Sequence, residues 1–166
     1  MYTDFYKKAS DSWRKRAGGA ELLTKIDLAL RLIVALGYIA LLVLLVVTHD
    51  SHLVRAIVVP LLCYLFVTIM RAIINAPRPY TSYDIDPLIN KDTPGHSMPS
   101  RHMASAIIIA LTVFWSIGPV WGSIALIICL AIAYVRIVGG VHYPRDIVVG
   151  AIIAALFALV GFVLIP

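Results

Sequence analysis

The chain has 166 residues, 61% of them hydrophobic, and carries a formal net charge of +5. Soluble globular domains are closer to half apolar, so the composition excludes an ordinary soluble domain and indicates one small integral membrane domain. It also argues against a nucleic-acid partner, because a wetted basic surface with stacking aromatic residues is largely missing from the sequence. Cys63 and Cys129 each lie alone in an apolar run and are expected to be packing residues rather than a disulfide or metal ligands.

The first residues are predicted to form an amphipathic helix that lies at the membrane surface. Aromatic residues at Tyr2, Tyr6 and Trp13 recur at helical spacing on one side, and basic residues occupy the other. Six of the fourteen basic residues precede the first long apolar run, which favours contact with anionic lipids. The Gly18–Gly19 pair ends this helix, and a solvated tail is the simpler alternative.

Residues 26–166 are predicted to form a transmembrane domain, with residues 1–25 as the interfacial segment. We expect an all-α bundle of about five transmembrane helices, because five apolar runs follow one another in this part of the chain. Several runs are shorter than the roughly 20 apolar residues that usually cross a bilayer, so their polar ends are expected to line a protein-enclosed cavity. The runs cover residues 28–47, 54–74, 103–117, 120–135 and 147–165.

Two polar intervals, residues 71–102 and 136–146, fall on the same side of such a five-helix bundle. Arginine, histidine and aspartate near a bilayer cost free energy, so these residues indicate a functional site. The opposite side carries a short loop at residues 49–52 and the Gly118–Pro119 turn. One face of the bundle is therefore expected to hold the chemistry.

Arg71 and Arg78 are seven residues apart, and Pro77 is predicted to end the helix between them. Arg71 would then reach from a helix and Arg78 from a loop. Two guanidinium groups that converge at membrane depth match the geometry of a phosphate. Two arginines that extend separately to the interface are the simpler alternative.

Ser100 is predicted to cap the helix that carries the third apolar run. The N-terminus of a helix binds anions through its free backbone N–H groups, and His102, in the first turn, would contact the bound group. Taken alone, His102 would more often be a structural histidine.

His142 precedes Pro144, which suits the first turn of the last helix. Asp146 is close enough to accept an N–H from the imidazole, which would leave the other ring nitrogen free as a nucleophile or base. A helix-capping aspartate is the simpler interpretation. With Arg136 as a third cation, this set is what metal-free phosphoryl transfer through a phosphohistidine requires, with His142 as nucleophile and His102 as acid. We expect no metal and no cofactor.

These residues form three motifs that resemble those of the type 2 phosphatidic acid phosphatase (PAP2) family. The family pattern is a lysine, six residues and Arg-Pro, then Pro-Ser-Gly-His, and then Ser-Arg, five residues, His, three residues and Asp. All three occur here in the same order and spacing over roughly residues 54–150, as Arg71 with Arg78-Pro79, Pro99-Ser100-Arg101-His102, and Val135-Arg136 with His142 and Asp146.

The resemblance implies His142 as the nucleophile, His102 as the acid and Asp146 as the residue that orients His142. It implies phosphate binding by Arg71, Arg78, Ser100 and Arg136, and by Arg101 if that side chain points inward.

Three positions depart from the family pattern. Arg71 replaces lysine, which keeps the charge but changes its reach. Val135 replaces serine, and Arg101 replaces glycine. An inward-pointing Arg101 would favour a diphosphate or a second anionic group. The membrane members of the family generally have six spans, one more than we predict.

The expected function is hydrolysis of a lipid phosphate that enters from the bilayer, such as phosphatidic acid, phosphatidylglycerol phosphate, a polyprenyl diphosphate or a lipid A phosphate. A small anion channel or transporter that uses the arginines without hydrolysis is the alternative. A zinc hydrolase built on His96, His102, His142 and Asp146 is a third hypothesis. A haloperoxidase is disfavoured, because its chemistry does not require five apolar runs.

The protein is expected to be a bacterial integral membrane protein. The basic N-terminus is predicted to lie in the cytoplasm by the positive-inside rule, and with five spans the active face lies on that same side. Bacterial relatives mostly work on the other side. The sequence does not define an oligomeric state.

Overall fold

The computed structural model describes residues 2–90 and 93–164. This part of the chain is helical and contains no strand. Four helical stretches are long and apolar enough to cross a membrane, and α5 is a shorter apolar helix of 17 residues. The predicted membrane helical bundle with an N-terminal amphipathic helix is therefore confirmed. The elements are α1 (Tyr2–Arg14), α2 (Gly19–Val47), α3 (Leu53–Ile74), α4 (Pro79–Ser82), α5 (Arg101–Ile117), α6 (Pro119–Val138), α7 (Pro144–Ala158) and a final π-helical turn, η1 (Leu159–Leu164).

Most helix ends lie where proline, glycine or serine predicts them. α5 starts after Ser100, whose side chain accepts a hydrogen bond from the backbone N–H of Met103. α7 starts at Pro144, and Asn75 ends α3 in the left-handed conformation, with φ 41°. These short-range signals therefore fix where the polar loops begin.

Two helices extend further than predicted. α2 begins at Gly19 rather than near Leu28, because its first turns are amphipathic: Leu23 is buried, while Glu21 and Lys25 form an exposed ion pair of 2.7 Å. α6 continues to Val138 rather than ending near residue 135. Arg136 consequently projects from a helix and not from a loop.

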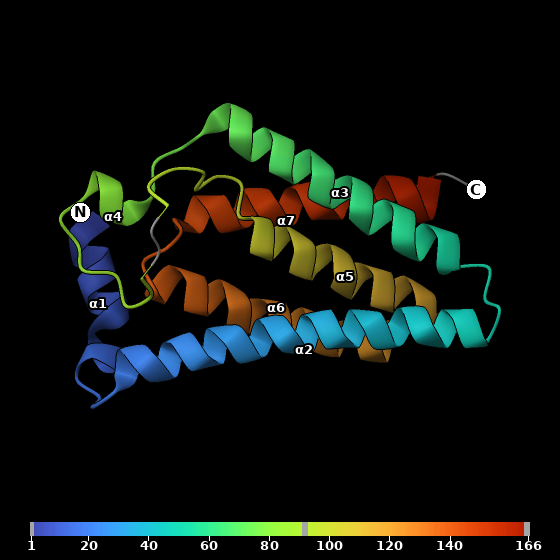
Figure 1. Cartoon of the computed structure of the whole chain (residues 1–166), viewed down its shortest axis with the longest axis horizontal. Helices are drawn as coiled ribbons and strands as arrows, with labels where there is room; N and C mark the ends of the chain where they lie inside the picture. Colours follow the sequence, from blue (N-terminus) through green and yellow to red (C-terminus); the bar gives the residue numbers. More distant parts are fainter. Residues whose placement is uncertain (1, 91–92, 165–166) are drawn as a thin grey trace.

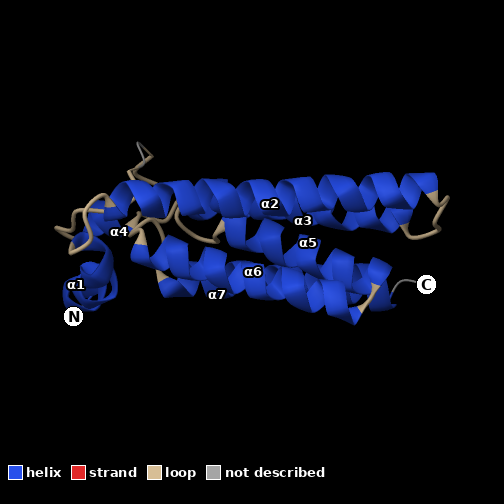
Figure 2. Cartoon of the chain, turned by 90° about the horizontal axis from the view of Figure 1, so that it is seen from below, coloured by secondary structure: helices blue, strands red, loops and turns tan. Residues whose placement is uncertain are grey.

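The five long helices run along one common direction, and α1 lies across one end of the bundle beside α4 (Figure 1). Figure 2 shows the same arrangement from below, with α1 and α4 at one end and the C-terminus at the other. α5 packs against α2, α3, α6 and α7. Its contact with α7 is very close: a Cβ at Gly150 would lie only 2.7 Å from the carbonyl oxygen of Ser100. Backbone contact therefore holds the starts of α5 and α7 together.

The aromatic side of α1 contacts the bundle. The buried Tyr6 hydroxyl donates to the carbonyl of Asp86 and accepts from the N–H of Leu88, each at 3.1 Å. Tyr6 also packs on Gly140, where a Cβ would lie 2.9 Å from its hydroxyl and where φ is +74°. The first helix is thus attached to the turn that leads into α7.

Candidate active site

The two polar intervals meet at the end of the bundle that carries α1, as the five-helix topology predicts (Figure 1). A cavity of about 380 Å³ opens between them. Its lining combines the end of α3, the start of α5 and the loops before α4, α5 and α7. The residues that line it are Thr68, Arg71, Ala72, Arg78, Thr93, His96, Arg101, His102 and His142.

Two arginines approach the cavity from different elements. Arg71, in the last turn of α3, donates from Nη1 to the carbonyl of Pro99 at 2.9 Å. Arg78 comes from the loop and is buried; its Nε donates to Gly95 and its Nη1 to Val141, at 3.2 and 3.0 Å. Because this guanidinium is buried, an anionic partner would stabilise its charge. The predicted pair, one from a helix and one from a loop, is therefore present.

The start of α5 forms a second wall. Arg101 and His102 lie in its first turn, and both line the cavity. The guanidinium carbon of Arg101 lies 5.5 Å from the centroid of the Tyr64 ring, within cation–π range. The backbone N–H of Ser100 donates to the carbonyl of Asp146 at 2.9 Å, which connects the starts of α5 and α7.

His142 lies fully buried at the cavity, in the turn before α7. Its Nδ1 is 3.5 Å from Oδ2 of Asp146, so the two side chains are in contact without a tight hydrogen bond. Burial, and to a smaller extent the charge of Arg78, lower the pKa of His142 to about 4 against the opposing effect of Asp146. The imidazole is therefore neutral at pH 7.

Asp146 does more than cap its helix. Its Oδ2 accepts from the backbone N–H of Tyr143 at 3.0 Å, as a capping residue does, and also from the hydroxyl of Ser97 at 2.5 Å. Ser97 is itself buried. Two hydrogen bonds thus fix the carboxylate that contacts His142, and capping and orientation are combined in one residue.

Arg136 is held by a residue from the first long helix. Its Nη2 lies 3.0 and 3.2 Å from the two carboxylate oxygens of Asp27, and both residues are buried. Arg31 also pairs with Asp27, at 3.1 Å. Asp27 therefore shares one negative charge between a buried and a partly exposed arginine.

Buried polar atoms without a hydrogen bond gather at this site. In the described part of the chain, eight buried side-chain nitrogen or oxygen atoms have no hydrogen-bond partner, and five of these belong to three residues of the site. They are Nε and Nη1 of Arg136, both ring nitrogens of His142, and Oδ1 of Asp146. Most buried polar groups in proteins are hydrogen-bonded. Five exceptions within three neighbouring residues therefore indicate a functional site, because such an arrangement does not favour stability.

The structure brings the predicted residues to one end of the bundle, but in two layers. Arg71, Arg78, Arg101, His102 and His142 line the cavity, whereas Ser100, Arg136 and Asp146 are buried outside its lining.

Asp27 and Ser97 were not among the residues predicted for the site. An acidic residue at the start of an apolar helix is the signal that could have identified Asp27. Ser97 lies directly beside His96, which is exposed and contacts the carbonyl of Arg71 through Nδ1 at 2.9 Å. Among the described residues, no three His, Cys, Asp or Glu side chains are grouped so that they could hold a metal ion. The zinc-hydrolase alternative therefore finds no ligand set there.

Comparison with known proteins identifies the family. The sequence profile of the PAP2 superfamily matches residues 52–166. The crystal structure of Aquifex aeolicus LpxE has the same fold, with a TM-score of 0.75 and 22% sequence identity, over 95% of this chain and 92% of that one. A comparison with curated proteins found no match. The profile covers α3 to the end of the chain, including all three motifs, and the chain therefore belongs to the PAP2 superfamily as a membrane-embedded phosphatase.

Proposed function

We propose that the protein hydrolyses a phosphate monoester or diphosphate of a membrane lipid, without a metal ion, through a phosphohistidine on His142. The observation that carries the proposal is the set of unpartnered buried atoms at Arg136, His142 and Asp146, beside a cavity lined by three arginines. A bound phosphoryl group would supply acceptors for the arginine donors and an electrophile for the imidazole.

The geometry favours Nε2 of His142 as the attacking atom. Nδ1 faces the carboxylate of Asp146, whereas Nε2 has no partner. When a neutral imidazole carries its proton on Nδ1 and directs it at a fixed carboxylate, the lone pair on Nε2 is available for attack. Ser97 and the backbone of Tyr143 hold that carboxylate in place.

Phosphate binding is assigned to the cations and to the start of α5. Arg71, Arg78 and Arg136 would neutralise the equatorial oxygens of the transferred group, and the backbone N–H groups after Ser100 would add helix N-terminal donors. The described carbonyl contacts of Arg71 and Arg78 orient each guanidinium before the substrate arrives. Pre-oriented donors stabilise charge that develops in the transition state.

The reaction proceeds in two steps. Nε2 of His142 attacks phosphorus, the bond to the leaving oxygen breaks, and His102 donates a proton to that oxygen. Water then attacks the phosphohistidine, His102 accepts its proton, and the P–N bond breaks to release phosphate and neutral His142. The lipid part of the leaving group would remain in the bilayer.

The test measures phosphate release by detergent-purified protein from lipid mono- and diphosphates, in excess chelator. We expect the wild type to release phosphate and to form an acid-labile phosphoprotein with ³²P-labelled substrate, and His142→Gln to do neither while keeping its thermal stability at pH 7.5. A variant that hydrolyses lipid phosphates normally without His142 would refute the mechanism. Failure of the wild type on every substrate would instead favour the anion channel or transporter.

We also propose that the site end of the bundle faces the cytoplasm. The basic residues in and around α1 are found at this end, and the positive-inside rule places them there. A topology reporter inserted in the α2–α3 connection, which lies at the opposite end of the bundle, should be active outside the cytoplasm. A reporter active in the cytoplasm at that position would reverse the assignment.

A further inference from the structure

A second cavity adjoins the one that holds His142. It has a volume of about 280 Å³ and lies between α2, α3, α5 and α6. Arg101 and His102 line both cavities, so the two adjoin at the first turn of α5. Arg31 of α2 and Tyr64 of α3 form the other side of the second cavity. A bound molecule could therefore extend from His142 past Arg101 to Arg31.

The charge of the two cavities exceeds what one phosphate requires. Their lining contains four arginines (Arg31, Arg71, Arg78 and Arg101), and none of the described lining residues is acidic. Asp27 lies behind Arg31, but it shares its charge with the buried Arg136. A single phosphate dianion at His142 would leave Arg101 and Arg31 without an anionic partner from the substrate. The excess charge is on the side of the second cavity.

An apolar cleft continues from the second cavity. It has a volume of about 360 Å³, and its lining comes from α2, α3 and α5. Tyr64, Ser105 and Ile109 line both spaces, and most other residues of the cleft are aliphatic. The order along the molecule is thus reactive histidine, cationic cavity and apolar cleft. This is the order of groups in a lipid whose chain ends in two consecutive phosphates.

We propose that Arg31 and Arg101 form a second anion subsite, which binds the inner phosphate of a lipid diphosphate. The terminal phosphate then lies at His142, and the hydrocarbon chain occupies the cleft between α2 and α3. This inference rests on the proposed function and assigns its substrate class. Arg31 lies outside the residues matched by the family profile, and Arg101 stands where the family motif has glycine. The family motifs therefore prescribe neither arginine of this subsite.

The subsite also defines the leaving group. Attack by Nε2 of His142 on the terminal phosphorus breaks the bond to the bridging oxygen, and the electron pair stays on the inner phosphate. The products of the complete reaction are inorganic phosphate and a lipid monophosphate. Arg31 and Arg101 would stabilise the negative charge that develops on the leaving phosphate, as fixed donors do in other acyl and phosphoryl transfers.

The experiment compares farnesyl diphosphate with farnesyl monophosphate, because both carry the same chain. The measured quantity is the ratio of kcat/KM for the two substrates, in the wild type, Arg31→Gln and Arg101→Gly. We expect the wild type to prefer the diphosphate and each variant to lower the ratio at least about tenfold, since each removes charge-assisted hydrogen bonds to one phosphate. Two independent variants protect the test against misfolding of either one.

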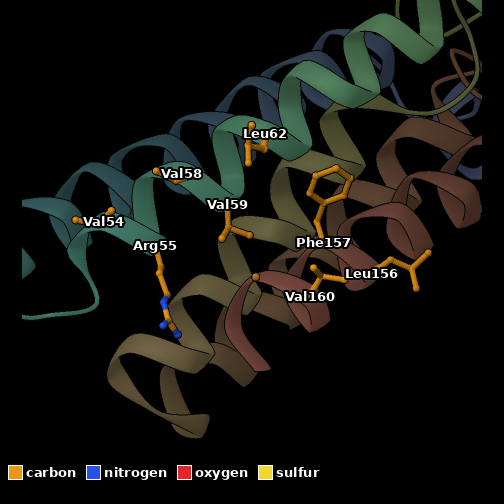
Figure 3. Close-up of a pocket in the computed structure, with 9 residues that line it drawn as sticks. Val54, Arg55, Val58, Val59, Leu62, Leu156, Phe157 and Val160 are labelled. Atoms are coloured by element: carbon orange, nitrogen blue, oxygen red, sulfur yellow. The ribbon is translucent and has the colours of Figure 1, made fainter. Parts of the chain in front are cut away.

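Arg55→Gln is the matched control. Arg55 lies on α3 at the opposite end of the bundle, beside a separate apolar groove between α3 and α7 (Figure 3). Its guanidinium carbon is 5.8 Å from the centroid of the Trp115 ring, so the variant removes a partly packed arginine without changing the two cavities. We expect its substrate ratio to equal that of the wild type.

The outcomes separate this inference from the proposed function. Hydrolysis of both substrates with a ratio that Arg31→Gln and Arg101→Gly leave unchanged would overturn the subsite and leave the phosphatase intact. A wild type that prefers the monophosphate would also overturn it. No release from either substrate would refute the proposed function, and the subsite with it.

Discussion

Replacing Asp27 with asparagine removes the carboxylate that pairs with the buried Arg136. The Arg136 side chain is 0% exposed and that of Asp27 is 5% exposed, and Nη2 reaches both carboxylate oxygens. Removing one partner of a buried ion pair leaves an uncompensated charge and typically costs about 3–5 kcal/mol. The asparagine amide retains one acceptor oxygen, so we expect the lower end of that range, about 3 kcal/mol.

Arg31 provides the comparison within the same cluster. It also pairs with Asp27, at 3.1 Å, but its side chain is 42% exposed. Solvent screens such a pair, and its contribution to the free energy of unfolding is about 1 kcal/mol or less. Arg31→Gln should therefore destabilise the protein far less than Asp27→Asn does, although both variants break an ion pair of the same carboxylate.

The assay is thermal unfolding of purified protein in detergent. A loss of about 3 kcal/mol in a chain of this size lowers Tm by roughly 6–12 °C, whereas Arg31→Gln should shift it by only about 2 °C. The double variant Asp27→Leu with Arg136→Met should recover most of the loss, because apolar side chains replace a buried pair at little cost. It should nevertheless be inactive if Arg136 binds phosphate.

Equal Tm shifts for Asp27→Asn and Arg31→Gln would refute this reasoning. A double variant that is no more stable than Asp27→Asn would also refute it, because the loss of stability could then not come from the unpaired charge of Arg136.

Three further perturbations test other parts of the site. Gly150→Ala should lower stability by about 1–3 kcal/mol and reduce kcat, because its Cβ would lie 2.7 Å from the carbonyl oxygen of Ser100 at the start of α5. The stability is measured as Tm and kcat as the rate of phosphate release. Ser97→Ala should lower kcat about tenfold or more with a smaller change in KM, because it removes a 2.5 Å hydrogen bond to the carboxylate of Asp146. The third is acidification: His142 has a pKa of about 4 when folded, below its ordinary 6.5, so its contribution to stability is complete above pH 6.5 and is lost as the pH falls toward 4. Between pH 7.5 and 5 we expect a loss of about 2 kcal/mol, measured as a change in Tm.

Each of these has a matched control. Gly37→Ala should leave Tm unchanged or raise it, because nothing lies within 4 Å of a Cβ there. Ser116→Ala removes a buried hydroxyl that has no hydrogen-bond partner, so kcat should not change. His142→Gln should lose the pH-dependent part of the Tm change between pH 7.5 and 5. A wild type and a His142→Gln variant with the same pH profile would contradict a depressed pKa at this position.

Local signals in the sequence predicted the frame of the site. Ser100 and Pro144 each have a short-range effect on the backbone, as a hydrogen-bonding cap or a fixed φ, and helices begin beside them as predicted. Because two apolar runs separate the two polar intervals, both intervals were predicted to lie at the same end of the bundle. Neither inference depended on contacts between distant residues.

The parts that the sequence did not predict depend on such contacts. Asp27 and Arg136 are 109 residues apart, and no local pattern pairs them. Ser97 lies 49 residues from Asp146, in a loop without regular periodicity. The spacing of aromatic residues in the first helix predicted one apolar face, and Tyr6 on that face is buried against the turn after α6. An amphipathic pattern shows that one face is apolar, and it does not show whether lipid or protein covers that face.

The connections at the end of the bundle opposite the site are short and lie far from the cavity, so insertions there should affect the site least. α5 and α6 are joined there by Gly118 alone, with φ +106°, and α2 and α3 by residues 48–52. The cavity lining comes from the other end of the bundle, where α3 ends and α5 begins (Figure 1). A tag, an epitope or a soluble domain inserted between α2 and α3 would therefore be separated from the site by the full length of the helices. The connection between α2 and α3 is therefore a better place for an insertion than the loops near α1, which supply residues to the cavity and to the carboxylate of Asp146.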